Sequence, residues 1–400
     1  MATVRIREPR SLPILLSYGF RPLFLGGAAF GIVGILVWLP MFEGRFALPL
    51  GMPARDWHGH EMTFGYGAAV IAGFLFTAVP NWTGRAPVAG ATLLLLVVTW
   101  LAGRIAMAAS GLLGLAPTAA VDLAFLVLVA AVAGREIVAG NSRRNFKLLG
   151  VLAILIAANA VFHLEVIRHG TASYGHRMGL AAVVALIVLI GGRIVPNFTR
   201  NALMRAEPGS LPAPFGRFDM ASAAGVAVAL ASWVAAPDDM VTAVLCGAAG
   251  LLLAVRLGRW AGHRAWRDPL VLVLHAGYTF VPLGFLMVAL SIAQPALVLP
   301  GAGVHAWGAG AIAVMTLAVM TRATLGHTGR PLTASRGTVV VYLLAVLAAL
   351  ARIGAAIPST MDILLLHIAV YAWVGAFAGF VAIYGPMLMT PKASVGPPGC

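Results

Sequence analysis

The sequence is short of charged residues and has almost no cysteine. Of its 400 residues, 27 are Lys or Arg and 13 are Asp or Glu, whereas 60% are hydrophobic and the mean hydropathy is +0.94. A soluble chain of this length needs many more charged side chains to cover its surface. The composition therefore excludes a soluble globular protein, a disordered chain, a coiled coil and a disulfide-rich scaffold. It predicts a protein that crosses a membrane many times.

Several motifs of well-known enzyme classes are missing too. The two cysteines, Cys246 in an apolar segment and Cys400 at the end of the chain, cannot form a disulfide framework. There is no Walker phosphate-binding loop, no G-x-G-x-x-G after a strand and no C-x-x-C-H. The functions of an ATPase, a dinucleotide-binding enzyme and a c-type cytochrome are therefore unsupported.

Apolar runs of about 20 residues, enough to cross a hydrocarbon core of about 30 Å, recur along the whole chain. They predict an all-α, multi-pass fold in one membrane domain with twelve transmembrane helices and both termini on the same side. The first run is too long for the apolar part of a signal peptide and lacks an A-x-A cleavage site, so we expect a retained helix. The spans are expected at 22–41, 60–80, 88–109, 117–137, 146–166, 176–196, 218–236, 239–258, 269–292, 304–323, 337–356 and 362–384.

The net charge of +14 would suggest nucleic-acid binding in a soluble protein, but here its distribution along the chain indicates orientation instead. With a cytoplasmic N-terminus, 21 of the Lys and Arg residues fall on the inner side and 6 on the outer side. Cytoplasmic loops collect Lys and Arg, so both termini are predicted to be cytoplasmic, and lipid rather than nucleic acid is the expected partner. The inner group includes Arg5, Arg7, Arg10, Arg143 and Arg144; the outer group is Arg45, Arg55, Arg104, Arg168, Arg177 and Arg352.

An internal repeat is indicated by three equal spacings. His60 and Thr83, His176 and Thr199, and His305 and Thr328 are each separated by 23 positions, at the second, sixth and tenth predicted spans. We predict three four-helix units, at 1–140, 141–262 and 263–400, in which these three spans are equivalent and line a central axis. Chance is the alternative, because Thr, Gly and Arg are common at cytoplasmic helix ends.

Histidine is scarce, and its placement is uneven. Seven of the ten histidines lie at or near the predicted outer face, where basic residues are fewest. A neutral nitrogen ligand concentrated at one membrane depth is what a heme or copper site needs. These seven are His58, His60, His163, His169, His176, His305 and His367; His275 lies deeper, and His263 and His327 are placed in inner loops.

The W-H-G-H-E run at 57–61 is the sharpest local signal. On a regular helix, residues two apart point about 200° from each other, so His58 and His60 would serve different sites. A non-helical entry at Gly59 would instead let both histidines bind one ion. Asp56 and Glu61 are expected to orient the imidazoles by accepting their second N–H groups. Together with His305, the two histidines are favoured as metal ligands.

Other polar residues allow two interpretations each. Ionisable side chains inside spans suggest function, and Glu61, Asp122, Arg104 and Arg193 are such residues. The carboxylates of Asp122 and Glu165 suit a proton relay, or else they pair with Arg104 and Arg168. His169, His176 and His263 are expected to be solvated rather than ligating, and Met315 and Met320 to pack in the core rather than bind copper.

Long stretches of the chain resemble the NnrS family of bacterial membrane proteins, which is associated with nitric oxide metabolism. They cover most of the chain, in order. The stretches are YGFRPLFL at 18–25, WHGHEMTFGYGAAVIAGFLFTAVPNWTGR at 57–85, NAVFHL at 159–164, IGGRIVPNFTRNAL at 190–203, LHAGYTFVPLG at 274–284 and HAWGAGAIAVMTLAVMTRATLGHTGRPL at 305–332.

The resemblance implies a heme- and copper-containing protein of the bacterial inner (cytoplasmic) membrane that counters nitrosative stress. The histidines that fall within the matching stretches are the candidates for heme or metal binding, and His176 and His367 fall outside them. The candidates are His58, His60, His163, His275, His305 and His327, with His58, His60 and His305 as the favoured metal ligands.

The leading functional hypothesis is a nitric oxide reductase that converts two NO to N2O. Heme b would be the cofactor, with copper as a second candidate, and a quinol or a separate protein would donate electrons. Glu61 and Asp122 are the predicted catalytic residues, as proton donors. The alternatives are a non-enzymatic heme or copper binder that sequesters NO or protects iron pools, and a transporter.

Overall fold

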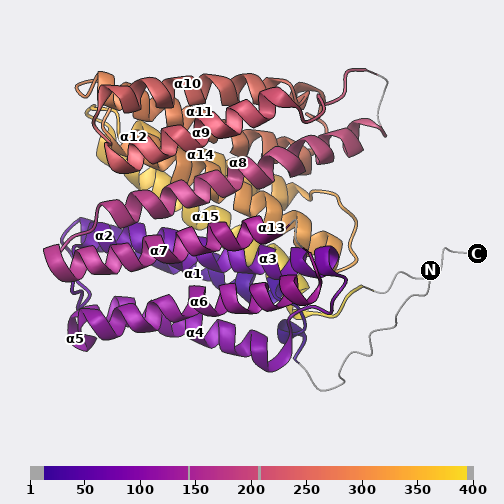
Figure 1. Ribbon diagram of the computed structural model, residues 1–400, viewed down its shortest axis with the longest axis horizontal. Coiled ribbons are helices and arrows are strands. Elements are labelled where there is room, and N and C mark those ends of the chain that lie inside the picture. The colour runs from indigo at the N-terminus through magenta and orange to yellow at the C-terminus, as the bar shows by residue number, and fades with distance from the viewer. Residues whose placement is uncertain (1–12, 143–144, 206–208, 394–400) are drawn as a thin grey trace, which may run out of the picture.

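A computed structural model describes residues 13–142, 145–205 and 209–393 as a bundle of helices (Figure 1). Twelve helical spans are long and apolar enough to cross a membrane, and no strand occurs within these ranges. The predicted all-α, twelve-span fold is therefore confirmed.

Ten spans are single α-helices, and the other two are each built from three helical segments. The single helices are α1 (Phe20–Phe42), α4 (Gly90–Ala108), α6 (Leu115–Ala139), α7 (Phe146–His169), α8 (Tyr174–Leu203), α9 (Arg217–Ala235), α10 (Met240–Gly258), α11 (Pro269–Ala293), α14 (Arg336–Gly354) and α15 (Asp362–Met389). The composite spans are α2 (Ala54–His60), η2 (Glu61–Gly67) and α3 (Ala68–Thr83), and α12 (Gly301–His305), η5 (Ala306–Ile312) and α13 (Ala313–His327). The segments η2 and η5 are π-helical.

The second span begins at Ala54, earlier than the predicted start at residue 60. Hydropathy finds only the apolar part of a helix, and this helix continues into a polar segment that the protein itself buries. Asp56 in this segment is buried and accepts hydrogen bonds from Thr171 and Ala172. Likewise, His327 is the last residue of α13 and not a loop residue.

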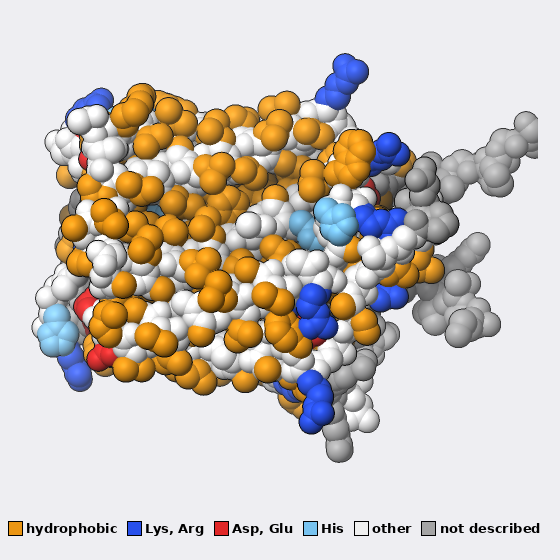
Figure 2. Space-filling model, turned by 90° about the horizontal axis from the view of Figure 1, so that it is seen from above, with side chains coloured by type: hydrophobic (Ala, Val, Ile, Leu, Met, Phe, Trp, Pro, Cys, Tyr) orange, Lys and Arg blue, Asp and Glu red, His pale blue; other side chains and the backbone are white. Residues whose placement is uncertain are grey.

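The outer surface of the bundle is suited to lipid. Large apolar side chains such as Val244, Leu251 and Leu343 are exposed on it, and Figure 2 shows apolar side chains across the middle of one face. On the same face, most Lys and Arg side chains gather near one end, which we call the basic end, where α3, α6, α8 and α13 finish (Figures 1 and 2). The basic end corresponds to the predicted inner side, and its cytoplasmic location stays a prediction. Of the residues behind that prediction, Arg5, Arg7, Arg10, Arg143 and Arg144 lie outside the described ranges, as does Cys400.

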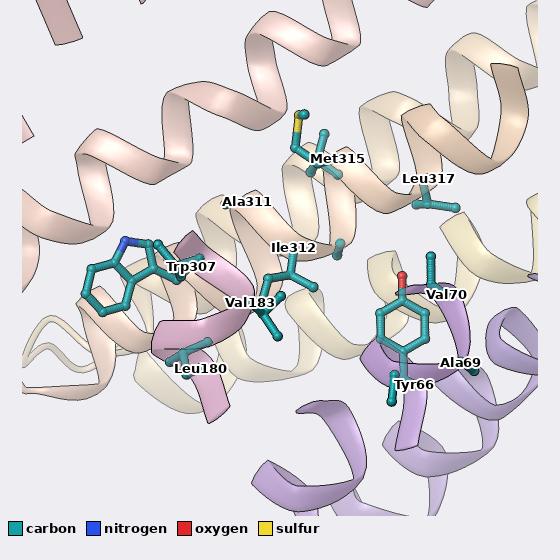
Figure 3. Packing of buried hydrophobic residues seen from close by; sticks show 14 of the residues in the cluster. Tyr66, Ala69, Val70, Leu180, Val183, Trp307, Ala311, Ile312, Met315 and Leu317 are labelled. Carbon is teal, nitrogen blue, oxygen red and sulfur yellow. The ribbon is translucent and has the colours of Figure 1, made fainter. Parts of the chain in front are cut away.

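The second, sixth and tenth spans meet inside the bundle. Helix α8 contacts both η2 and η5, and Figure 3 shows Val183 of the sixth span beside Ile312 of the tenth, with Tyr66 of the second among the same buried side chains. These side chains are nearly or completely buried. Packing by apolar side chains thus brings helices that are far apart in the sequence together inside the bundle.

Both composite spans widen into a π-helix directly after a histidine, His60 in one and His305 in the other. Glycines accompany both segments where neighbours come close: a Cβ atom at Gly65 would lie 2.5 Å from the Arg104 guanidinium, and one at Gly310 would clash with the Phe280 ring. Such π-helical turns are frequent at functional sites. The sixth span, α8, is α-helical throughout, and the three predicted repeats stay a prediction.

Candidate functional site

A cavity of about 420 Å³ lies in the half of the bundle where α2 and α12 begin. Its wall includes residues of α1, α2, α8, α9, η5, α14 and α15. The volume is typical of sites for small molecules and cofactors. Most of the wall is apolar, and the polar side chains that stand out on it are Arg55, Asp56, His58, His176, Arg177, His305 and Arg352.

His58 reaches the cavity from α2. Its ring stacks on Trp38, with 4.3 Å between the ring centroids. Its Nδ1 atom is buried and has no hydrogen-bond partner among the described residues. A buried polar nitrogen without a partner costs free energy, so native proteins seldom leave one unsatisfied. His58 therefore has a ring nitrogen that a ligand would satisfy.

His305 reaches the cavity from the end of α12. Its Nδ1–H donates to the carbonyl oxygen of Gly301, at 2.7 Å. That bond assigns the proton to Nδ1 and leaves the lone pair on Nε2. A histidine whose Nδ1 is anchored to a backbone carbonyl in this way is a typical metal ligand through Nε2.

The cavity has an excess of positive charge. Arg55 lies near Asp56, at 3.6 Å, and Arg177 donates hydrogen bonds to Val234 and Ser173. Arg352, in contrast, pairs with no carboxylate in the described part of the chain, although it lies within electrostatic range of both His58 and His305. A partly buried guanidinium beside two imidazoles suits a ligand that carries a carboxylate or another anionic group.

His176 is also part of the cavity wall, close to α2. A Cβ atom at position 59 would lie 2.6 Å from the His176 ring, so only glycine allows the ring this close to the helix. The nearest carboxylate oxygen, of Asp56, is 3.8 Å from His176 Nε2, which is too long for a hydrogen bond. Asp56, expected to orient His58 or His60, instead accepts hydrogen bonds from Thr171 and Ala172.

A second polar cluster lies among α2, α6 and α7. His60 Nε2 is 3.1 Å from Asp122 Oδ2 and 2.9 Å from Asn159 Oδ1, and His163 Nε2 is 3.0 Å from the same Asp122 oxygen. Asn159 Nδ2 donates to that oxygen as well, at 2.8 Å. All four side chains are buried. We call His60, Asp122, Asn159 and His163 the inner cluster.

Two further charged residues complete the surroundings of the inner cluster. Glu61 Oε1 accepts a hydrogen bond from His60 Nδ1, at 2.9 Å. Arg104 donates to both Glu61 and Asp122, so one guanidinium bridges two buried carboxylates. The ion pair between Asp122 and Arg104 is the second of the two interpretations that the sequence allowed for Asp122.

The two histidines of the W-H-G-H-E run point into different sites. Residues 54–60 form an α-helix, so the non-helical entry at Gly59 is not present, and the side chains diverge. His58 lines the cavity with His305, whereas His60 belongs to the inner cluster. Of the two alternatives open for His58 and His60, the structure places them at separate sites, with His305 beside His58.

His275 lies near the start of α11 and His327 at the end of α13, and both positions are toward the basic end. His275 Nε2–H donates to Thr199 Oγ1, at 2.8 Å, because the threonine hydroxyl itself donates to the Val195 carbonyl. His327 packs against the rings of Tyr18 and Phe20. Neither histidine contributes to the cavity wall or to the inner cluster.

The remaining candidates have local roles. His367 is bound to Glu43, at 2.9 Å, and His169 is exposed. Glu165 accepts three backbone N–H groups, from residues 173–175, where α8 begins. Met315 and Met320 are buried packing residues, as expected.

Two residues of these sites were not singled out from the sequence. Asn159 was visible only as part of a matching stretch, and Arg352 only as one of the few outer basic residues. Both are polar residues within apolar spans, and such residues are expensive there and usually functional. Applied to amides as well as to charged groups, the same criterion would have found both.

Comparison with known proteins gives one family. A family model described as NnrS protein matches residues 14–392, nearly the whole chain. No curated protein matches the sequence.

Proposed function

The chain belongs to the NnrS family, membrane proteins linked to the response to nitric oxide, and we propose that it binds heme in the cavity and reduces NO to N2O there. The observation that carries the proposal is the pairing of His58 and His305 on one cavity wall, each with a ring nitrogen available to a ligand. Such a pairing suits a cofactor with a coordinating metal better than it suits a transported solute.

The residues of the cavity fit a heme. His305 would hold the heme iron through Nε2, because its Nδ1–H donates to the Gly301 carbonyl. Arg352 is the proposed partner of a heme carboxylate. Gly308 lines the cavity, and a Cβ atom there would meet no described atom within 4 Å, so the wall has room on this side.

Heme, when bound, supplies an iron centre that binds NO and accepts electrons. Reduction of two NO to N2O and water consumes two electrons and two protons. Quinol or a separate protein is the proposed electron donor. The chain itself supplies an apolar wall that admits NO, including Ile35, Leu180 and Val370.

The roles proposed for Glu61 and Asp122 follow from their hydrogen bonds. Both carboxylates accept hydrogen bonds from the Arg104 guanidinium, which fixes their positions beside His60. Sequence reasoning suggested that the two residues donate protons. That role stays a proposal here, with the Arg104 guanidinium as the group that holds both carboxylates in place.

The proposal is tested by measuring N2O from NO with purified full-length protein, a reductant and a matched concentration of free heme. The expected result is heme bound near one per chain and N2O formation above the free-heme control. Bound heme without turnover would favour a non-enzymatic NO or heme binder. Protein that binds neither heme nor copper would overturn the proposal and favour a transporter.

Filling the cavity should prevent heme binding without harming the fold. We expect Gly308→Leu to lower heme occupancy by about tenfold, or ~1.4 kcal/mol, because the new side chain enters the space that heme would use. Heme per chain is measured from the pyridine hemochrome spectrum. Gly150→Leu is the control, because Gly150 lies on α7 away from the cavity wall and also has nothing within 4 Å. Equal heme content in the two variants would contradict the heme position.

A further inference from the structure

The inner cluster was not used in the proposed function, and it has the composition of a metal site. His60, Asp122 and His163 each offer one ligand atom, and these atoms lie within 4.8 Å of one another. We propose that the inner cluster binds one first-row transition-metal ion, copper or zinc, at a site separate from the cavity. The proposal does not depend on heme binding in the cavity.

The hydrogen bonds around the inner cluster direct the right atoms toward a metal. Glu61 accepts from His60 Nδ1, which leaves His60 Nε2 to coordinate. A carboxylate behind a ligating histidine is the usual arrangement in metal sites, and it fixes the tautomer and the ring direction. His163 Nε2 and Asp122 Oδ2 complete a set of two imidazoles and one carboxylate, and Asn159 Oδ1 lies 2.9 Å from His60 Nε2 as a fourth donor.

The spacing of the donors is close to that of metal ligands. The separations of 3.0 and 3.1 Å between the histidine nitrogens and the Asp122 oxygen are those of hydrogen bonds. Donors at 2.0–2.1 Å from a tetrahedral ion would be roughly 3.3 Å apart, so each histidine nitrogen lies within a few tenths of an ångström of the separation from the Asp122 oxygen that such an ion requires. Imidazole nitrogens select copper and zinc over magnesium and calcium, which prefer oxygen.

The charges of the cluster leave room for a cation. Glu61 and Asp122 carry two negative charges and Arg104 one positive charge, and all three side chains are at most 5% exposed. With neutral imidazoles, one negative charge is uncompensated in the interior of a membrane protein, which is unfavourable. A copper(I) ion balances it, as does a divalent ion with one bound anion. A proton on a histidine is the competing occupant.

The surroundings of the inner cluster contain buried polar atoms without partners and aromatic rings that shield the site. Glu61 Oε2 and Arg104 Nε are buried and have no hydrogen-bond partner within the described ranges. The rings of Phe64 and Phe162 lie 5.1 and 4.6 Å from the His60 ring and cover it. An apolar shell of this kind controls water access to a metal.

The test is metal stoichiometry in purified full-length protein. The protein is loaded with copper or with zinc, desalted and measured by plasma mass spectrometry, and we expect about one ion per chain. His163→Ala should reduce this content about tenfold, an apparent loss of ~1.4 kcal/mol. His169→Ala is the control, because it removes an exposed histidine from the same helix.

A second set of measurements distinguishes the residues that coordinate the metal from those that only orient its ligands. Glu61→Gln keeps the shape of the side chain but weakens its hold on His60, and we expect metal affinity to fall 10–100-fold. Copper(II) bound to the unmodified protein should show coupling to two imidazole nitrogens in its electron paramagnetic resonance spectrum. This readout does not require any variant to fold.

Three results would overturn the proposal: far less than one ion per chain after loading, equal metal in His163→Ala and unmodified protein, or a copper spectrum without imidazole coupling. The inner cluster would then be a proton-balanced ion-pair network. His305→Ala distinguishes this site from the heme proposal, since it should lose heme and keep the metal. His163→Ala should do the reverse.

Discussion

Replacing His305 with alanine is expected to remove heme from the protein almost completely. The variant loses the nitrogen that would hold the heme iron, and heme per chain should fall by at least about 100-fold. Loss of a residue that only orients a metal ligand typically costs 10–100-fold. NO turnover should fall with it. The absorption spectrum of purified protein, compared at equal protein concentration, measures the effect.

His367→Ala is the matched control for this prediction. The His367 ring also bonds through Nδ1 to a carbonyl four residues earlier, that of Ile363, but its Nε2 is taken by Glu43. Its replacement should leave heme content unchanged. Unchanged heme in His305→Ala would contradict the ligand assignment, and His58→Ala would then identify whether the other cavity histidine holds the iron.

The second large effect is expected at Arg104. Arg104→Met removes the one guanidinium that bridges Glu61 and Asp122 and leaves two buried carboxylates uncompensated. Loss of one partner of a buried ion pair typically costs about 3–5 kcal/mol. We expect a large drop in the unfolding temperature in detergent and in the yield of monodisperse protein.

Two comparisons decide whether the uncompensated charge causes the loss of stability in Arg104→Met. Arg45→Met breaks the surface ion pair between Arg45 and Glu43, in which the Arg45 side chain is 71% exposed. This change should lower the free energy of unfolding by at most about 1 kcal/mol. The triple variant Arg104→Met, Glu61→Gln, Asp122→Asn removes all three charges together and should recover much of the lost stability. An Arg104→Met variant as stable as Arg45→Met would refute the bridging role.

Many residues of the inner cluster and its surroundings could be singled out from the sequence alone. Glu61, Asp122, Arg104 and His163 are ionisable residues in apolar spans, and this contrast with their neighbours along the chain is enough to single them out. Their partners could not be named in the same way. Asp122 approaches His163 across two neighbouring helices, and the rotation of each helix about its axis decides which side chains meet.

The two histidines of the W-H-G-H-E run show most clearly what could not be predicted from the sequence. Two histidines separated by one glycine allow either a shared ion or two separate sites. The start of α2 at Ala54 decides for separate sites, since a regular helix turns His58 toward the cavity and His60 toward Asp122. Hydropathy could not place that start, because the polar first turn is buried by protein and not by lipid.

By itself, the sequence determined the membrane-spanning class, the number of spans, the family and the uneven placement of basic residues and histidines. These properties depend on local composition, because a bilayer requires about 20 apolar residues per helix wherever the helix lies. The tertiary structure decided that His58, His305 and Arg352 surround one cavity and that His60 joins Asp122 and His163. Such groupings arise from helix packing, which brings together residues far apart in the chain and which apolar spans of similar composition do not specify.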